Sequence, residues 1–577
     1  MSSLSKARVE TRASRAQHCA PTDSRRDLRR TRRKIAARVC ATTAIALSLL
    51  SACGGDSDDD QASAYVAARD MVSVTGGTVV AAADSTADMR VFRGIPFAAP
   101  PVGSLRWKAP QPVTAWSGVR RSDNFSAACV MADRPAGRVG SILYQQTESQ
   151  SEDCLYLNVW TAAATAGEKR PVMLLLHGGA YLIGAGSQPN YNGKGLAAKG
   201  AVVVTMNYRL GPLGFLAHPE LSAESADGTS GNYALYDAIA VLKWIKSNIA
   251  ALGGDPDNVT IYSESAGAGL ASVLYASPLA SGLFHKLVLE SLAALPAGSD
   301  TPTLAQAEAA GSTFAANLGA ADLAALRAKS ATEIMAGSGA ISQPIVDGAV
   351  LPDQLDLLIK AGRVNAVPLL AGWNADEGTP YPAFATTLAG YTSKVAATYG
   401  SFAEDFKAAY PASSDDDVQA MAYEPMRDGT FAWNVWTLAR AHAALAQAPT
   451  YLYFFTRRPS YFSDQSFTGL SPAYKFGAHH TLEQVYFYDN LDVSAPARDY
   501  TDVDRKIAST ASSYLINFAR SGDPNGKGLP TWPRFTGPTS QTMEIGDRIA
   551  PTTVPFQSQL AFWDRYYSAT LGRDLPF

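Results

Sequence analysis

Three short apolar runs separated by a helical pattern constrain the fold of this chain more than any other feature. The runs are Val172–Leu176, Val202–Met206 and Val259–Tyr262, and each is typical of a buried parallel strand. Between the second and the third run, residues 233–252 carry apolar side chains at roughly helical spacing and end at two glycines, a helix stop. Strands that alternate with helices predict a mainly parallel sheet with helices on both faces.

Composition and charge indicate one globular body behind a basic N-terminus. Hydrophobic residues make up 47% of the chain and charged residues 18%, as in ordinary globular proteins. Residues 1–38 carry twelve Lys or Arg against three acids, which leaves 37 basic and 49 acidic side chains in the remainder. An acidic body speaks against nucleic-acid binding, because neutralising phosphates requires a basic surface. Residues 71–577 contain no repeat and no second linker, so we expect one domain there, with 305–336 as an inserted helical segment.

A candidate nucleophile follows the third apolar run. The sequence SESAG at 263–267 stands between a strand-like run and a helical run, which is the context of a nucleophile elbow. Small neighbours would let the backbone turn sharply and lift the hydroxyl of Ser265 to the edge of the sheet. The usual pattern is G-x-S-x-G, and Ser263 replaces its first glycine. A short serine-rich turn is by itself more often only a loop, so the motif alone leaves both interpretations open.

A series of segments in one order resolves this ambiguity. These segments are VFRGIPFAAPPVGSLRWKAPQPVTAW, SEDCLYLNVW, HGGAY, NYRLGPLGFL, GNYALYDAIAVLKWIKSNIAALGGDPDNVTIYSESAG, PIVDGAVLP, GDPN and TWPRF. With them the chain resembles, from about Val72 to Trp563, the type-B carboxylesterase and cholinesterase family of α/β hydrolases, and in particular its bacterial para-nitrobenzyl-esterase-like members. The resemblance implies the α/β-hydrolase fold, with a mostly parallel central sheet, helices on both faces and helical insertions over the active site.

The resemblance also implies a catalytic triad. Ser265 is the nucleophile, Glu377 in NADEG is the acid, and His480 in GAHHTLE is the base. The neighbours Asp376 and His479 are the alternatives for the acid and the base. A serine hydroxyl is a weak nucleophile until a base removes its proton, and a carboxylate holds that base in the correct tautomer. The order Ser, Glu, His along the chain is the order expected for this fold.

A second departure from the family pattern and one further loop belong to the same site. Thr481 follows the predicted base where the family commonly has glycine, which reduces local backbone freedom. The segment HGGAY after the first apolar run matches the family loop that binds the tetrahedral oxyanion. The resemblance therefore assigns the oxyanion hole to the backbone amides of Gly179, Ala180 and Ala266.

Two of the five cysteines remain in the body of the protein. An even pair in an exported protein predicts one disulfide, and Cys129 and Cys154 match a family disulfide that closes a loop near the gorge. The alternative is two unrelated buried thiols. The cholinesterase branch of the family has an aromatic residue for choline in this loop. Here the loop contains no Trp, and its only aromatic residue is Tyr144, so the resemblance does not predict a choline ester as substrate.

The N-terminus has the pattern of an export signal. A basic segment precedes the apolar stretch Val39–Leu50, which is too short to span a bilayer. The stretch leads into LSAC, which resembles a bacterial lipoprotein signal with Cys53 as the acylated residue. We expect a signal peptide at 1–52 and an acidic flexible tether at 53–70. An ordinary secretory signal is the alternative, and the choice between general and twin-arginine export stays open.

These features predict an exported, lipid-anchored carboxylic-ester hydrolase. It would act on small-molecule esters through an acyl-enzyme, without a metal or an organic cofactor, since no cluster of His, Cys and Asp has metal-ligand spacing. It would meet a membrane only through its anchor, and its oligomeric state stays open. The alternatives are an amidase or lactonase with the same site, and a catalytically silent binding protein of the same fold.

Overall fold

A ten-stranded sheet organises the protein. The structure is a computed structural model that describes residues 70–133, 145, 148–462, 476–494 and 496–575, all within the unit Asp59–Phe577. The predicted signal peptide, and the predicted tether up to residue 69, lie outside the described residues. From one edge to the other the strands are β15 (Ile549–Thr553), β14 (Gln541–Ile545), β13 (Thr450–Phe455), β12 (Leu369–Asn374), β11 (Lys286–Glu290), β10 (Gly254–Glu264), β8 (Arg170–Leu176), β9 (Val202–Met206), β7 (Tyr156–Thr161) and β3 (Arg90–Pro96).

The centre of this sheet is parallel, as predicted. The seven strands from β14 to β9 pair in parallel, whereas β15, β7 and β3 join antiparallel at the two edges. The strands of two smaller sheets precede most strands of the central sheet along the chain. One consists of β1 (Met71–Val74), β2 (Gly77–Val80) and β4 (Val119–Arg121), and the other of β5 (Ala128–Cys129) and β6 (Gln150–Ser151).

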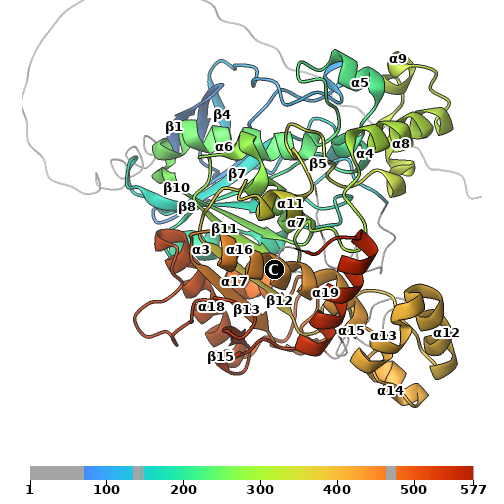
Figure 1. Cartoon of the computed structure of the whole chain (residues 1–577). Helices are drawn as coiled ribbons and strands as arrows, with labels where there is room; N and C mark the ends of the chain where they lie inside the picture. Colours follow the sequence, from blue (N-terminus) through green and yellow to red (C-terminus); the bar gives the residue numbers. More distant parts are fainter. Residues whose placement is uncertain (1–69, 134–144, 146–147, 463–475, 495, 576–577) are drawn as a thin grey trace, which may run out of the picture. The chain divides into compact units, whose positions relative to one another are not determined.

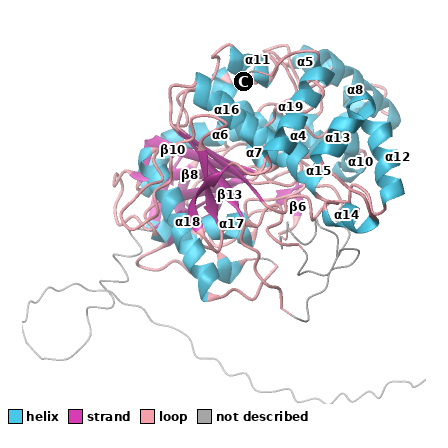
Figure 2. Cartoon of the chain, turned by 60° about the horizontal axis from the view of Figure 1, so that its bottom comes forward, coloured by secondary structure: helices cyan, strands magenta, loops and turns pink. Residues whose placement is uncertain are grey.

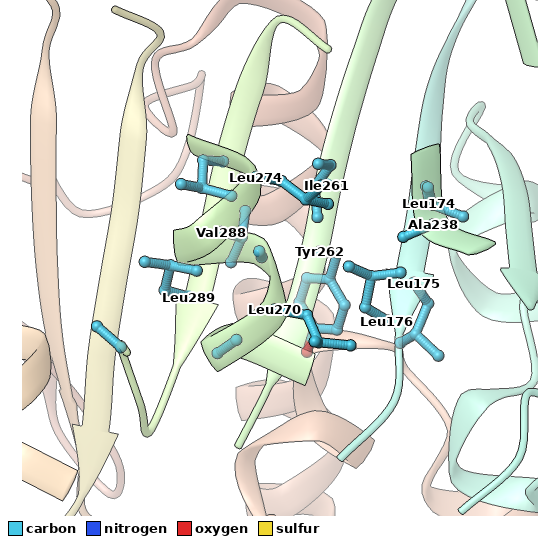
Figure 3. Close-up of a cluster of buried hydrophobic side chains, with 14 of the residues drawn as sticks. Leu174, Leu175, Leu176, Ala238, Ile261, Tyr262, Leu270, Leu274, Val288 and Leu289 are labelled. Carbon is cyan, nitrogen blue, oxygen red and sulfur yellow. The ribbon is translucent and has the colours of Figure 1, made fainter. Parts of the chain in front are cut away.

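The predicted apolar runs form strands in the middle of the sheet. Their side chains are apolar on both sides because both faces of the sheet are covered there. The side chains of Leu174–Leu176, Ile261, Val288 and Leu289 are buried, and Leu270 and Leu274 come from a helix against them (Figure 3). Burying one such side chain contributes roughly 1.5–3 kcal/mol. A strand that is buried on both faces reads as a continuous apolar run rather than an alternating one.

Helices lie on the two faces of the sheet (Figure 2). On one face α6 (Tyr233–Asn248), α7 (Ala266–Ala276) and α16 (Trp433–Leu445) pack against β10 to β13, and on the other α3 (Lys194–Ala198) and α18 (Asp502–Ser521) pack against β7 to β10. The predicted helical pattern 233–252 thus forms α6 and a short 3₁₀ turn after it. The fold is the α/β-hydrolase fold that the sequence predicted.

Two helical insertions extend beyond the sheet layers. The first is the predicted one and consists of α8 (Leu304–Asn317), α9 (Leu323–Arg327) and α10 (Ala331–Ala336). The second was not predicted and comprises α12 (Leu388–Tyr399), α13 (Ala403–Ala409) and α14 (Asp415–Ala420), near α19 (Gln557–Leu571) in Figure 1. The remaining α-helices are α4 (Gly211–Phe215), α5 (Pro219–Glu224), α11 (Leu355–Lys360), α15 (Glu424–Met426) and α17 (Glu483–Phe487). In the described part of the chain, every helix is too short or too polar to cross a bilayer.

Candidate active site

Ser265 stands at the sharp turn between β10 and α7. Its backbone has φ 51° and ψ −126°, a conformation that a residue with a side chain adopts only under strain. The amide of Ser265 donates to the carbonyl of Glu290, 2.9 Å away at the end of β11. The sheet therefore fixes this strained turn from the neighbouring strand, as a nucleophile elbow requires.

The residues around the turn explain both the motif and its departure. A Cβ atom on Gly267 would lie 2.0 Å from the carbonyl oxygen of Leu176, so only glycine lets α7 pass the end of β8. Ser263 is buried, and its hydroxyl donates to the carbonyl of Val288 at 2.7 Å. A serine therefore fits where the usual pattern has glycine, because the adjacent strand supplies an acceptor for its hydroxyl.

The structure brings the three predicted triad residues together. Nε2 of His480 lies 2.8 Å from Oγ of Ser265, and Nδ1 of His480 lies 2.6 Å from Oε2 of Glu377. Glu377 comes from the loop that follows β12, and His480 from the loop that precedes α17. Both side chains are buried, so these contacts lie away from bulk water.

The two alternative residues make other contacts. The carboxylate of Asp376 accepts hydrogen bonds from Arg458, at 2.6 and 2.9 Å, and from the amide of Ala478 at 2.7 Å. Nδ1 of His479 lies 2.5 Å from the carbonyl of His480, and its Nε2 contacts Arg498. Within the residues that the structure describes, no hydrogen bond joins Asp376 or His479 to Ser265. Asp376 instead ties the acid loop to the base loop, since its amide also donates to the carbonyl of Ala478 at 2.9 Å.

Three further buried glutamates surround the site, and the sequence analysis missed them. Glu264 precedes Ser265, and its Oε1 lies 3.2 Å from Nε2 of His480. Burial raises the pKa of Glu264 well above its ordinary value, and the nearby carboxylates of Glu483, Glu290 and Glu377 raise it further. The signal was present in the sequence, because Glu264 lies inside the SESAG motif and Glu483 ends GAHHTLE.

A shared hydroxyl connects two of these acids. Oγ of Ser291 lies 2.5 Å from Oε1 of Glu377 and 2.9 Å from Oε1 of Glu483. A hydroxyl has one hydrogen, so one of the two contacts requires a proton on a carboxyl group. Burial, followed by the charge of Glu377, raises the pKa of Glu483 to about 8. We therefore assign that proton to Glu483. The amide of Asn374 donates to Glu377 at 2.7 Å, which favours the charged form of Glu377 instead.

The predicted oxyanion loop follows β8. The carbonyl of Gly179 accepts hydrogen bonds from the amides of Leu182 and Ile183, each at 3.0 Å. This carbonyl therefore bonds within the loop. Among the described residues, no acceptor is bonded to the amides of Gly179, Ala180 or Ala266. Ala180 is exposed and has φ 53°, so its methyl group stands in the left-handed region.

The predicted disulfide between Cys129 and Cys154 is present, with Cα atoms 4.9 Å apart. The carbonyl of Cys154 accepts from Nδ2 of Asn207 at 3.2 Å, and Oδ1 of Asn207 accepts from the amide of Gly186 at 2.9 Å. The bridge is thereby linked to the segment that follows the oxyanion loop. Tyr144, the loop's one aromatic residue, lies outside the described residues.

Comparison with known proteins places these features in a family. A model described as "Carboxylesterase family" matches residues 69–563. The chain is 38% identical over 488 residues to fumonisin B1 esterase from Sphingopyxis macrogoltabida, which covers 80% of this chain and 84% of that protein. It is 35% identical over 484 residues to para-nitrobenzyl esterase from Bacillus subtilis (strain 168), covering 79% of this chain and 91% of that protein. A solved structure of PNB esterase matches with a TM-score of 0.70 and 30% identity, covering 86% of this chain and 100% of that chain.

Proposed function

Because the chain belongs to the carboxylesterase family and is an enzyme that hydrolyses carboxylic esters, we propose that hydrolysis proceeds through an acyl-enzyme formed on Ser265. The observation that carries the proposal is the position of His480, whose two ring nitrogens lie 2.8 Å from Ser265 and 2.6 Å from Glu377. An imidazole in this position can accept the serine proton at Nε2 while Nδ1–H stays bonded to the carboxylate.

The first half of the reaction transfers the acyl group to the enzyme. Oγ of Ser265 attacks the ester carbonyl while its proton moves to Nε2 of His480. The negative charge that develops on the carbonyl oxygen is bound by the amides of Gly179, Ala180 and Ala266. Deleting one such donor typically costs about 3–4 kcal/mol of transition-state stabilisation. Collapse of the tetrahedral intermediate breaks the bond to the alcohol oxygen, which takes the proton from Nε2.

The second half repeats these steps with water. His480 removes a proton from water, the resulting hydroxide attacks the acyl carbonyl, and the same amides bind the oxyanion. Collapse releases the carboxylic acid and returns the proton to Ser265. Glu377 stabilises the imidazolium in both halves, and the proton on Glu483 keeps a second negative charge away from Glu377.

A burst experiment tests the acyl-enzyme. Mixing the protein with para-nitrophenyl acetate should release para-nitrophenolate in a fast phase that titrates the enzyme, followed by steady turnover. Ser265→Ala should abolish both phases. Ser263→Ala is the matched control, because that hydroxyl donates to the backbone carbonyl of Val288, and it should keep both. Turnover by Ser265→Ala near the wild-type rate would remove Ser265 from its proposed role.

The substrates we propose are small organic esters. Relatives are named for esters of this kind, among them fumonisin B1 and cocaine. A panel of para-nitrophenyl esters with different acyl lengths, together with the corresponding amides, separates an esterase from an amidase. Faster hydrolysis of the amides than of the esters would contradict the proposal.

We also propose that the protein is exported and anchored through Cys53, on the pattern of residues 1–53 alone. Wild-type protein should fractionate with membranes and require detergent, whereas Cys53→Ser should be soluble. Mass spectrometry of the mature N-terminus tests this directly. An unacylated wild-type protein would overturn the anchor and leave an ordinary secretory signal.

A further inference from the structure

The imidazole of His480 packs against two aromatic rings that the proposed chemistry does not use. The centroid of the Phe431 ring lies 4.3 Å from that of the imidazole, with an interplanar angle of 33°. The Tyr381 ring lies at 5.9 Å and 56°, and the centroids of the two aromatic rings are 5.5 Å apart. The position of the imidazole therefore depends on ring contacts as well as on its hydrogen bonds to Ser265 and Glu377.

Phe431 is presented by an unusual element. It lies in a π-helical turn (Arg427–Ala432) inserted between α15 and α16. Such turns are rare and frequently occur at functional sites. Since successive residues of an α-helix point about 100° apart, the additional residue in the turn changes the direction of the side chains around it. The turn thus determines that Phe431 faces His480.

The π-helical turn is fixed to the C-terminal helix by buried polar contacts. The carboxylate of Asp428, which is fully buried, accepts from Nε of Arg427 at 2.7 Å and from the hydroxyl of Tyr410 at 2.9 Å. That hydroxyl accepts in turn from Nε1 of Trp563, on α19, at 2.9 Å. A Cβ atom on Gly429 would lie 2.7 Å from the Trp563 ring. The close packing of the turn against Trp563 leaves little room for it to relax.

We propose that Phe431 is a positioning residue for the imidazole of His480, and that the π-helical turn serves to present it. The inference rests on the proposed triad. During acylation Nε2 must deliver its proton to the departing oxygen, and a displaced ring would do this poorly. The loss matters most when the leaving group is a strong base, because a weakly basic phenolate departs without full protonation. Leu in place of Phe431 should therefore harm esters of basic leaving groups selectively.

The test uses three acetate esters of similar size, namely para-nitrophenyl, phenyl and para-methoxyphenyl acetate, whose leaving groups become more basic in that order. For Phe431→Leu, the loss of kcat/KM should be about tenfold larger for para-methoxyphenyl than for para-nitrophenyl acetate. The selective loss should appear in the rate constant of the acylation burst as well as in kcat/KM. Any change in kcat should be the same for the three esters, because they form the same acetyl-enzyme. Phe431→Tyr, which keeps the ring, should restore the wild-type dependence on the leaving group.

Phe518→Leu is the matched control. Phe518 is fully buried on α18, and its ring packs edge-on against Tyr451 of β13, with centroids 6.3 Å apart. Its loss should reduce stability and affect the three esters in equal proportion. If Phe431→Leu does not fold, Phe431→Met, which keeps more of the side-chain volume, takes its place. Equal proportional losses for the three esters in the Phe431 variant would overturn the inference. If the proposed triad itself were wrong, the Ser265→Ala variant would still hydrolyse these esters. That result is distinct from equal proportional losses in the Phe431 variant.

Discussion

The interior of the central sheet differs in backbone conformation and in buried charge from the end of the sheet at which its parallel strands terminate. We call this end the carboxyl edge. In the interior, β8, β10 and β11 bury apolar side chains on both faces (Figure 3). At the carboxyl edge of these strands, Ala180, Ser265 and Ser291 have positive φ, as does Thr481 beside the predicted base. The same edge buries the carboxyl groups of Glu264, Glu290, Glu377 and Glu483.

This difference indicates which part of the molecule stabilises the fold and which part carries the chemistry. A positive φ costs a residue with a side chain roughly 1–2 kcal/mol, and a buried carboxyl without adequate partners costs more. Such costs persist only where the surrounding structure imposes them. The interior therefore supplies the stability that holds strained and acidic groups in a reactive arrangement at the edge. Substitutions in the two regions should separate stability from activity.

Among the substitutions that compare these two regions, the largest expected effect is at the acid of the proposed triad. Glu377→Gln should lower kcat by about 10³- to 10⁴-fold, because an amide cannot hold the base in its reactive tautomer as a carboxylate does. Asp376→Asn is the control and should lose far less, since Asp376 contacts Arg458 and Ala478 rather than His480. The measurement is steady-state hydrolysis of para-nitrophenyl acetate. The reverse ranking of the two variants would move the acid to Asp376.

The interior should respond in the opposite way. Leu174→Ala, at a fully buried position of β8, should lower the free energy of unfolding by about 2–5 kcal/mol through the cavity it leaves. Its kcat per active site, counted by covalent titration, should stay at the wild-type value. A large loss of kcat per titrated site would show that the interior and the edge are not separable.

An effect of intermediate size should appear in the pH dependence of stability. Burial raises the pKa of Glu483 from 4.5 to about 8, so the folded protein holds a proton there that the unfolded chain has released. Its contribution to stability is complete below about pH 4.5 and is lost as the pH rises through about 8, with a slope of up to about 1.4 kcal/mol per pH unit. Glu483→Gln cannot titrate and should lack this slope.

Denaturant unfolding at about pH 5 and about pH 8 measures the Glu483 contribution as a difference between wild type and variant. Glu404→Gln, on the exposed surface of α13, serves as the control and should leave the difference between the two pH values unchanged. Parallel pH profiles for wild type and Glu483→Gln would mean that Glu483 is not protonated in the folded state at neutral pH.

The smallest effect concerns strain at the edge. Thr481 is β-branched, buried and held at φ 77°, so Thr481→Gly should raise the free energy of unfolding by about 1 kcal/mol. The same change at Thr552, in the extended strand β15, should lower it. Thermal unfolding of the two variants checks the signs. Destabilisation by both glycines would show that the backbone at Thr481 is not strained.

The sequence predicted the interior more completely than the edge. Apolar runs identify β8, β9 and β10 because burial on both faces leaves a direct trace in composition. The triad residues came from motifs in the chain, and the register of GAHHTLE already favoured His480 over His479. In the structure His480 contacts Ser265, whereas His479 contacts Arg498. The buried acids were missed because a glutamate in a motif does not reveal which other glutamates will surround it.

The sequence analysis also did not predict the π-helical turn or the second helical insertion. The turn depends on contacts between Asp428, Tyr410 and Trp563, which are far apart along the chain. Asp428, Gly429 and Thr430 have low helix propensity, but low propensity does not distinguish a π-helical turn from a break between two helices, and packing against α19 decides between them. Features of this kind follow from tertiary contacts rather than from periodicity.

The most direct test of the account is to identify the residue that a fluorophosphonate probe modifies. Such probes react with a serine only when a base activates its hydroxyl, so covalent labelling reports on the arrangement of the whole edge. Intact mass should increase by one adduct, and peptide mapping should place it on Ser265, with labelling lost in Ser265→Ala and strongly reduced in His480→Ala. A stable adduct on any other residue, or undiminished labelling of Ser265→Ala, would contradict the account.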